Sequence, residues 1–320
     1  MYAAPTRVET TDYHTAGEPF RIVTGGGPEI PGATVRERRE HARGSEAVDA
    51  VRRLLCHEPR GHADMYGCFL VPPDDEGAEL GVLFWHKDGY STACGHGTIA
   101  LGVWARETGR VAGDLTLDVP SGRVVARARG DAVAFVNVPA FVLARGVSVG
   151  EGVRADVAYG GALYASVPAD AFGLAVRGDH LPALIAAGRQ VKRALEGTDA
   201  ARHPSDDRLS GIYGTTFYEE LGPGHQRNVT VFADGEVDRS PCGSGTSARL
   251  ALLDAAGELD GDLVHESIVG TTFRGRVVER VTAEGRDAVV TEVEGTAYRT
   301  GEHQFTLDPD DPLGTGFVLR

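Results

Sequence analysis

Apolar and polar positions follow the same order in two distant parts of the chain. In each part a strand-like apolar run with an aromatic residue comes first, at 82–85 and at 229–232, and a short polar turn follows it. A mostly apolar run of helical length comes next, and glycines close it at Gly109 and at Gly257. The pattern predicts a strand, a turn and a helix twice, with the first helix over about 95–108 and the second between Cys242 and Gly257.

The rest of the chain extends this duplication. Short apolar runs between glycine-containing turns predict antiparallel strands at 115–119, 124–128 and 133–138, and further helices are expected from Ser45 onward and over 180–196. Residues 156–167 echo the opening strands, and Gly275-Arg-Val-Val-Glu-Arg echoes 122–127. We therefore expect an α+β fold of two similar domains about a pseudo-twofold axis, one holding 1–118 plus about 301–320 and the other 119–300.

Each of the two repeated helices begins with the sequence Cys-Gly-x-Gly-Thr, and Cys94 and Cys242 stand 148 positions apart. Both helices are apolar around much of their circumference, so each should be a central helix wrapped by a curved, mainly antiparallel sheet. A buried helix start places free N–H groups and about half a positive charge in a place of low dielectric. The glycines let a ligand approach the backbone, which predicts a site for an anion such as a carboxylate.

If the two helix starts face each other, one carboxylate can accept N–H bonds from Gly95, His96, Gly243 and Ser244 together. The two sulfur atoms would then flank the next carbon from opposite sides. We expect the pKa of a thiol at such a helix start to fall, which would suit it to general acid–base chemistry near neutral pH. Because two positive helix ends repel each other, we also expect the halves to open without a ligand and to close on one.

Composition narrows the remaining classes of function. A chain of 320 residues with a net charge of −14 does not suit nucleic acid or an anionic membrane as a partner. No apolar run approaches the ~18 residues of a membrane span, and the start of the chain lacks the layout of a signal peptide. Four scattered cysteines suit a reducing cytosol, so a cytoplasmic location is expected. Lys87 and Lys192 are the only lysines, which leaves few candidates for a Schiff-base cofactor.

The paired motifs resemble those of the proline racemase family over essentially the full chain. The resemblance is carried by Cys94-Gly-His-Gly, Asp238-Arg-Ser-Pro-Cys-Gly-Ser-Gly-Thr-Ser-Ala, His14-Thr-Ala-Gly-Glu-Pro and Gly61-His-Ala-Asp-Met-Tyr-Gly. It implies a diaminopimelate-epimerase-like fold and cofactor-free catalysis with Cys94 and Cys242 as the two bases. It further implies that His96 and Asp238 contact the substrate's ring nitrogen and that Phe232 and Tyr66 form an apolar pocket.

The resemblance leaves the reaction open between members of the family. In its trans-3-hydroxy-L-proline dehydratases a threonine replaces the second cysteine, whereas this chain keeps Cys242. The cysteine pair favours a racemase or epimerase of proline-type imino acids, with 4-hydroxyproline ahead of proline as the substrate. A dehydratase is the first alternative, because residues 86–92 resemble the corresponding sequence of the dehydratases. A non-catalytic amino-acid-binding protein is the second.

Other polar residues carry weaker expectations. Cys56, His62 and Cys68 fit no standard zinc spacing, so no metal is expected, and Cys56 and Cys68 read as packing residues. His14 and Glu18 are expected to fix a turn, whereas His62 and Asp64 could either shape or support the pocket. Residues 243–248 match a dinucleotide-binding pattern without the strand that should precede it. Either a monomer or a homodimer is compatible with the sequence.

Overall fold

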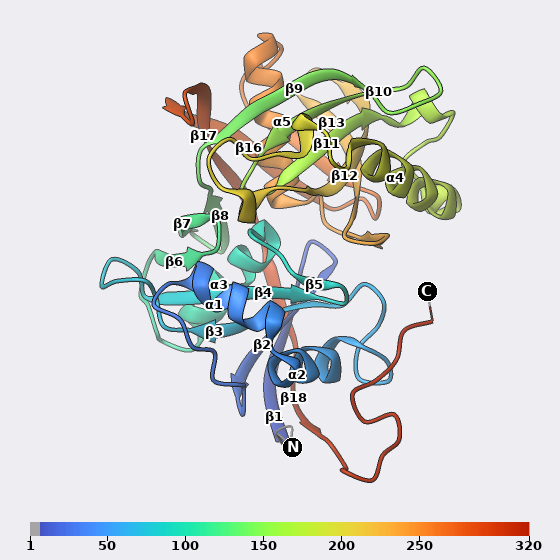
Figure 1. Ribbon diagram of the computed structural model, residues 1–320. Helices are drawn as coiled ribbons and strands as arrows, with labels where there is room; N and C mark the ends of the chain where they lie inside the picture. The colour runs from blue at the N-terminus through green and yellow to red at the C-terminus, as the bar shows by residue number, and fades with distance from the viewer. Residues whose placement is uncertain (1–6, 320) are drawn as a thin grey trace.

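The protein folds into two lobes, each built from a curved sheet around one long helix (Figure 1). The computed structural model describes residues 7–319. The lower lobe in Figure 1 contains three helices and nine strands among the described residues: β1 (Arg7–Thr15), β2 (Glu18–Gly25), α1 (Val35–Gly44), α2 (Glu46–Cys56), β3 (Tyr66–Val71), β4 (Leu80–His86), β5 (Gly89–Tyr90), α3 (Gly95–Glu107), β6 (Leu115–Val119), β7 (Gly122–Arg129), β8 (Ala132–Val136) and β18 (Ala297–Thr306).

The upper lobe holds the elements between β8 and β18 (Figure 1). They are β9 (Ala140–Ser148), β10 (Arg154–Tyr159), β11 (Leu163–Pro168), α4 (Leu181–Leu195), β12 (Ile212–Gly222), β13 (His225–Phe232), β14 (Glu236–Val237), α5 (Gly243–Ala256), β15 (Leu263–Ser267), β16 (Thr272–Ala283) and β17 (Arg286–Gly295). Short 3₁₀ turns lie at Ala169–Phe172, Gly178–His180, Asp199–Ala201 and Asp207–Leu209.

Strand pairing repeats between the lobes. In the lower lobe β2 pairs parallel with β3, β3 antiparallel with β4, and β4 parallel with β6. In the upper lobe β11, β12, β13 and β15 follow the same sequence of parallel, antiparallel and parallel pairs. The chain returns to the lower lobe through β18, which pairs antiparallel with β1 from Arg7 opposite Thr306 to Thr15 opposite Ala297. The predicted duplication therefore appears in the hydrogen-bonded topology.

Helices α3 and α5 are the centres of the two lobes. α3 packs against β1, β7, β8 and β18, and α5 packs against β9, β16 and β17. Ile99 and Leu101 on α3 and Ala248 and Leu250 on α5 have no exposed surface. Burying apolar side chains all around a helix stabilises it by tertiary packing, so propensity need not hold these glycine-containing segments helical.

Two of the three remaining α-helices in the described part of the chain lie where the sequence pattern predicted them. Ser45 caps α2 as expected, with its Oγ accepting a hydrogen bond from the N–H of Val48 at 3.4 Å. α4 lies within the expected 180–196. α1 was not expected, because its charged sequence has little apolar periodicity; Thr34 caps it, and it buries Val35 and Ala42.

The division of the chain into domains at 118 and 119 stays a prediction. In the structure β7, β8 and β18 pack on α3 together with β1 and β2, and β17 pairs with β8 to join the two lobes. Among residues 7–319, no helix is long and apolar enough to cross a membrane.

Candidate active site

The two repeated cysteines occupy the starts of the two central helices. Cys94 precedes α3 in an extended conformation, with φ −156° and ψ 107°, and its Sγ accepts a hydrogen bond from the N–H of Gly97 at 3.2 Å. Cys242 precedes α5 with φ 62° and ψ 98°. Both cysteines are buried. A thiol at a helix start can accept from the free N–H groups there, as Cys94 does.

Both helix starts meet at one small cavity. It is lined by all nine residues that the sequence predicted for the site: Cys94, Gly95, His96, Cys242, Gly243, Ser244, Asp238, Phe232 and Tyr66. The cavity has a volume of about 10 Å³, the space of roughly one water molecule. This arrangement is closed, and the cavity in it is too small for a proline-sized ligand, so the expected opening of the lobes stays a prediction.

Polar side chains in the cavity contact one another and the sulfur atoms. The Nδ1 atom of His96 lies 3.5 Å from Cys94 Sγ and 4.0 Å from an oxygen of Asp238. Asp238 Oδ1 accepts from the N–H of Ser240 at 2.8 Å and from its hydroxyl at 2.7 Å. Among the described residues, the buried hydroxyl of Ser244 has no hydrogen-bond partner. The cavity therefore offers an imidazole, a carboxylate and a hydroxyl beside the two thiols.

Burial dominates the acid–base properties of this closed cavity. It raises the pKa of the Cys94 thiol well above its usual range, although the Gly97 N–H acts in the opposite direction, and Asp238 raises it further. Burial also raises the pKa of Cys242. The expected fall in thiol pKa is therefore wrong for this arrangement, because desolvation of a thiolate outweighs the helix start when the lobes are shut.

The same desolvation sets the charges of the neighbours. Burial lowers the pKa of His96 to about 3, so its imidazole is neutral at pH 7. Burial raises the pKa of Asp238 to about 6, with the two hydrogen bonds from Ser240 acting against the rise. Asp238 is thus mostly ionised at pH 7 and can accept from a cationic ring nitrogen.

Tyr164 and Tyr213 also line the cavity, although the sequence analysis did not predict them there. The hydroxyl of Tyr213 lies 3.0 Å from that of Tyr66, which in turn lies 2.5 Å from Ser91 Oγ. The hydroxyl of Tyr164 lies 3.9 Å from Cys242 Sγ. The internal repeat offers the signal, because it aligns Tyr213 with Tyr66 and Tyr164 with Phe20. Since Tyr66 lines the predicted pocket, its repeat partner was a candidate too.

Two histidines and two carboxylates whose roles the sequence left less certain differ in what they contact. The histidines accept hydrogen bonds within their own turns, whereas the carboxylates accept from the other lobe. His14 Nδ1 accepts from the N–H of Gly17 at 3.2 Å inside its turn. His62 Nδ1 accepts from the N–H of Asp64 at 3.2 Å. Glu18 and Asp64 reach the other lobe, since Glu18 accepts from the N–H of Arg239 at 2.7 Å and Asp64 from that of Val237 at 3.0 Å.

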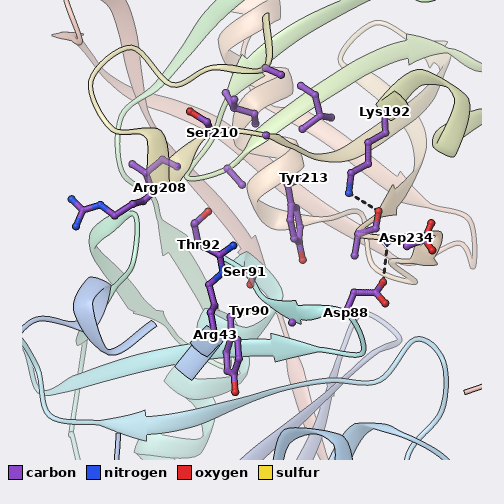
Figure 2. Close-up of a pocket in the computed structure, with 18 of the residues that line it drawn as sticks. Arg43, Asp88, Tyr90, Ser91, Thr92, Lys192, Arg208, Ser210, Tyr213 and Asp234 are labelled. Carbon is purple, nitrogen blue, oxygen red and sulfur yellow. Dashed lines mark hydrogen bonds between the residues drawn. The ribbon is translucent and has the colours of Figure 1, made fainter. Parts of the chain in front are cut away.

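A second, larger cavity of about 790 Å³ lies between the lobes (Figure 2). Tyr213 lines this cavity as well as the one with the cysteines, and Ser91 lies on its lower wall. Its polar lining includes Arg43, Arg208 and Lys192. The tyrosine side chain is therefore a shared wall between the open space and the closed cavity.

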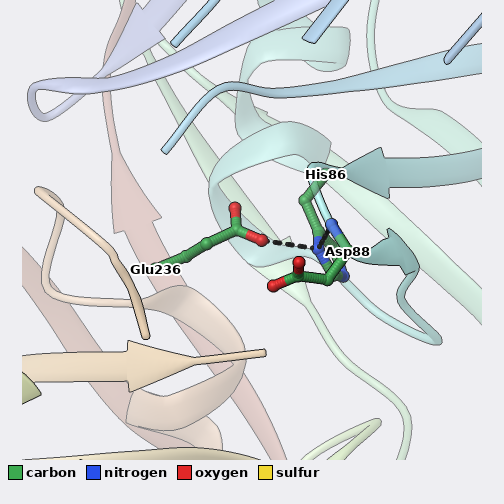
Figure 3. A group of neighbouring side chains, drawn as sticks. All are labelled: His86, Asp88 and Glu236. Carbon is green, nitrogen blue, oxygen red and sulfur yellow. Dashed lines mark hydrogen bonds and ion pairs between the residues drawn. The ribbon is translucent and has the colours of Figure 1, made fainter. Parts of the chain in front are cut away.

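His86, Asp88 and Glu236 form a third polar group, with one ligand atom of each within 4.8 Å of the others (Figure 3). His86 Nδ1 lies 2.9 Å from Glu236 across the two lobes. The Lys87 ammonium lies 2.7 Å from Asp88 and 4.0 Å from Glu236. Because Lys87 contacts both carboxylates and His86 contacts Glu236, we interpret the group as a network of ion pairs and hydrogen bonds between the lobes.

Comparison with known proteins agrees with this geometry. Residues 10–318 match the family described as proline racemase. A trans-3-hydroxy-L-proline dehydratase of Bacillus cereus is 44% identical over 327 residues, which cover 97% of both chains. A 3-hydroxyproline 2-epimerase of Burkholderia multivorans is 44% identical over 331 residues, which cover 98% of both.

A solved structure shares the whole fold. The hydroxyproline epimerase from Agrobacterium vitis, with bound trans-4-hydroxy-L-proline, is 30% identical and superposes with a TM-score of 0.89 over 98% of this chain and 96% of that chain. This likeness confirms the predicted α+β, diaminopimelate-epimerase-like fold. With a family match over nearly the whole chain and relatives at 44% identity, this enzyme belongs to the proline racemase family.

Proposed function

We propose that this enzyme inverts the α-carbon of a hydroxyproline, with Cys94 and Cys242 as the two bases. The observation that carries the proposal is that both cysteines line one small cavity, each at the start of its own buried helix. A reaction that removes a proton from one face of a carbon and returns one to the other face needs two such groups.

The substrate carboxylate would be held between the helix starts. The first N–H groups of α3 and α5 have no partner inside their helices, and both helix ends carry partial positive charge. Gly95, His96, Gly243 and Ser244 supply these N–H groups. A carboxylate bound in this place would hold the adjacent α-carbon between the two sulfur atoms. It would also draw electrons away from that carbon.

The ring nitrogen would then lie beside Asp238 and His96. A secondary ammonium donates two hydrogen bonds, which an ionised carboxylate and a neutral imidazole can accept. The charge of Asp238 is one of the causes that raise the pKa of both thiols. A cationic substrate nitrogen neutralises that charge and lowers the cost of forming a thiolate, so binding would prepare the base for proton removal.

The ring hydroxyl is the part of the substrate that distinguishes the family members. The sequence favours 4-hydroxyproline, but the Bacillus cereus and Burkholderia multivorans relatives described above are both named for 3-hydroxyproline. The neighbour that holds a 4-hydroxyproline is only 30% identical. We therefore infer 2-epimerisation of 3-hydroxyproline as the leading activity, with 4-hydroxyproline second and proline third.

Dehydration of trans-3-hydroxy-L-proline is the second candidate, because the Bacillus cereus relative carries that name. Both reactions begin with loss of the α-proton, and dehydration continues with departure of the C3 hydroxyl. The retained Cys242 favours epimerisation, since a second thiol in the cavity can reprotonate the opposite face.

Incubation in D₂O of L-proline and of the trans-3- and trans-4-hydroxy-L-prolines separates the candidates. Epimerisation gives a new epimer that carries α-deuterium. Dehydration instead gives a cyclic imine with loss of water. A protein that only binds the amino acid would leave the α-proton in place, and that outcome for every compound would refute the proposal.

A further inference from the structure

Residues 236–241, which we call the Cys242 arm, belong to the upper lobe but are held by carboxylates of the lower lobe. Asp64 is the centre of this contact. Its Oδ1 accepts from the N–H of Val237 at 3.0 Å, and its Oδ2 accepts from the guanidinium of Arg239 at 2.8 Å. Glu18 Oε2 accepts from the N–H of Arg239 at 2.7 Å.

The hydrogen bonds between Asp64 and the Cys242 arm form a ring. The Arg239 guanidinium also donates to the carbonyl of Val237 at 2.7 Å, so Asp64, Val237 and Arg239 form a ring of three hydrogen bonds. The Asp64 side chain is only 3% exposed. Hydrogen bonds between ionised partners are about twice as strong as neutral ones, and removal of one partner from a buried pair leaves the other charge uncompensated.

The ring fixes the residue between its two upper-lobe members. Asp238 stands between Val237 and Arg239, lines the cysteine cavity, and accepts hydrogen bonds from Ser240. Ser240 Oγ in turn accepts from the N–H of Cys242 at 3.1 Å. A continuous path of hydrogen bonds and backbone therefore runs from Asp64 to the second cysteine.

The two cysteines differ in how much support their backbones need. Cys94 is extended, a conformation that any residue adopts. Cys242 has φ 62° and ψ 98°, outside the regions that residues with a Cβ favour. Such a conformation persists only where the surrounding structure imposes it. Cys242 thus depends on contacts that Cys94 does not need.

We propose that Asp64, through Arg239, is a positioning residue for the Cys242 arm, including Asp238, and through it for Cys242 but not for Cys94, so that the second base is set in place only when the lower lobe clasps this arm. The inference rests on the proposed two-thiol epimerisation. Cys94 is held by its own helix and by the lower lobe's core, so loss of the clasp leaves it able to take the α-proton.

This asymmetry has a specific chemical consequence. For the epimer whose α-proton faces Cys94, that thiolate still removes the proton when the arm is displaced. The carbanion then recovers a deuteron from the same sulfur after its S–H has exchanged with D₂O. The product is α-deuterated substrate of unchanged configuration. For the other epimer, proton removal needs Cys242, so exchange and inversion fall together.

The test measures α-deuterium incorporation by NMR and inversion by chiral chromatography, for both epimers of the best substrate in D₂O. In Asp64→Asn and in Arg239→Gln, inversion should fall about tenfold or more in both directions. Because Asp238 lies on the same arm, exchange should fall too, but less than inversion, so the ratio of exchange to inversion should rise about tenfold for one epimer only. The double variant should lose little more than either single one, because both act through the same contact.

Asp12→Asn is the matched control. Asp12 and Arg21 form a buried pair within the lower lobe, 2.7 Å apart, with side chains 9% and 7% exposed, and they do not contact the Cys242 arm. Its exchange and inversion should stay in the wild-type ratio. A ratio of exchange to inversion that stays at the wild-type value for both epimers in the Asp64 and Arg239 variants, or no loss of inversion, would overturn the inference. A wild-type enzyme that inverts none of the compounds would instead refute the proposed function, on which the inference rests.

Discussion

Gly95 and Gly243 lie backbone against backbone where the two central helices begin. A Cβ placed on Gly95 would come 2.6 Å from the Cα of Gly243, and a Cβ on Gly243 would come 2.7 Å from the Cα of Gly95. Real Cβ atoms essentially never approach other atoms so closely. The closed site therefore exists only because neither helix start carries a side chain.

We expect Gly243→Ala to lower kcat/KM by on the order of 100-fold, the effect of a misplacement of about 1 Å at a reacting centre. The methyl group would push the helix starts apart, and each lobe would keep its own core. Alanine favours helix over glycine, so the melting temperature should not fall. Gly44→Ala, at a position with open space around it, is the control. Wild-type rates in Gly243→Ala would show that the lobes do not need to close this far.

Replacement of either thiol by a hydroxyl should stop inversion. A serine hydroxyl hardly ionises, so Cys94→Ser and Cys242→Ser should each lose about 10²-fold or more in racemisation, the scale of a lost general acid or base. Polarimetry measures the loss. Cys68→Ala, in the apolar core of the lower lobe, should keep its activity. Undiminished turnover in either serine variant would exclude a two-thiol reaction.

The hydroxyl of Tyr213 should favour substrates that carry a ring hydroxyl. It lies in the wall of the cavity, 3.0 Å from the Tyr66 hydroxyl, and a bound ring hydroxyl could join this pair. Tyr213→Phe should therefore lower the kcat/KM ratio of hydroxyproline to proline by about tenfold, because proline has no group to leave unpaired. Tyr218→Phe, whose ring instead packs under Arg249 at 3.8 Å, should leave the ratio unchanged. A ratio equal to that of wild type in Tyr213→Phe would exclude such a contact.

Local pattern predicted the site because the site is built from local signals. An apolar run after Cys-Gly-x-Gly marks a buried helix start, and its repetition in the sequence places two of them together. This pattern predicted six of the residues that line the cavity, from Cys94 to His96 and from Cys242 to Ser244, whereas Tyr66, Phe232 and Asp238 were expected there only from the resemblance to the family.

What sequence reasoning missed depends on contacts between distant segments. Tyr213 reaches the cavity through the pairing of β12 with β11 and β13, and no short stretch of sequence determines the register of these strands. The rise in the pKa of Cys94 follows from closure of one lobe on the other, which desolvates the thiol. Asp64 meets Arg239 across 175 positions of sequence. Each of these relations is a property of the assembled pair of lobes.

The ionisation of Asp238 should set the acidic limb of the pH profile. Burial raises the pKa of this carboxyl to about 6, and only its ionised form accepts from a cationic ring nitrogen. We expect kcat/KM to rise more steeply with pH below about 6 than above it, since this parameter reports the free enzyme and above 6 only the ionisation of a thiol, whose pKa is raised, still contributes. Asp238→Asn should be weakly active and should lack the limb. A wild-type profile that is flat from pH 5 to pH 7 would contradict this assignment.

As activity rises with pH, the contribution of Asp238 to the free energy of unfolding should fall. A carboxyl whose folded pKa is raised binds more protons in the folded than in the unfolded state, so its contribution to stability is present below the unfolded value and is lost as pH rises through the folded one. For Asp238 that window runs from 3.8 to about 6. The free energy of unfolding of the wild type, relative to Asp238→Asn, should therefore fall by on the order of 3 kcal/mol between pH 4 and pH 7. Denaturant unfolding at a series of pH values measures this difference, and a constant or rising difference would show that Asp238 is not desolvated in the free enzyme.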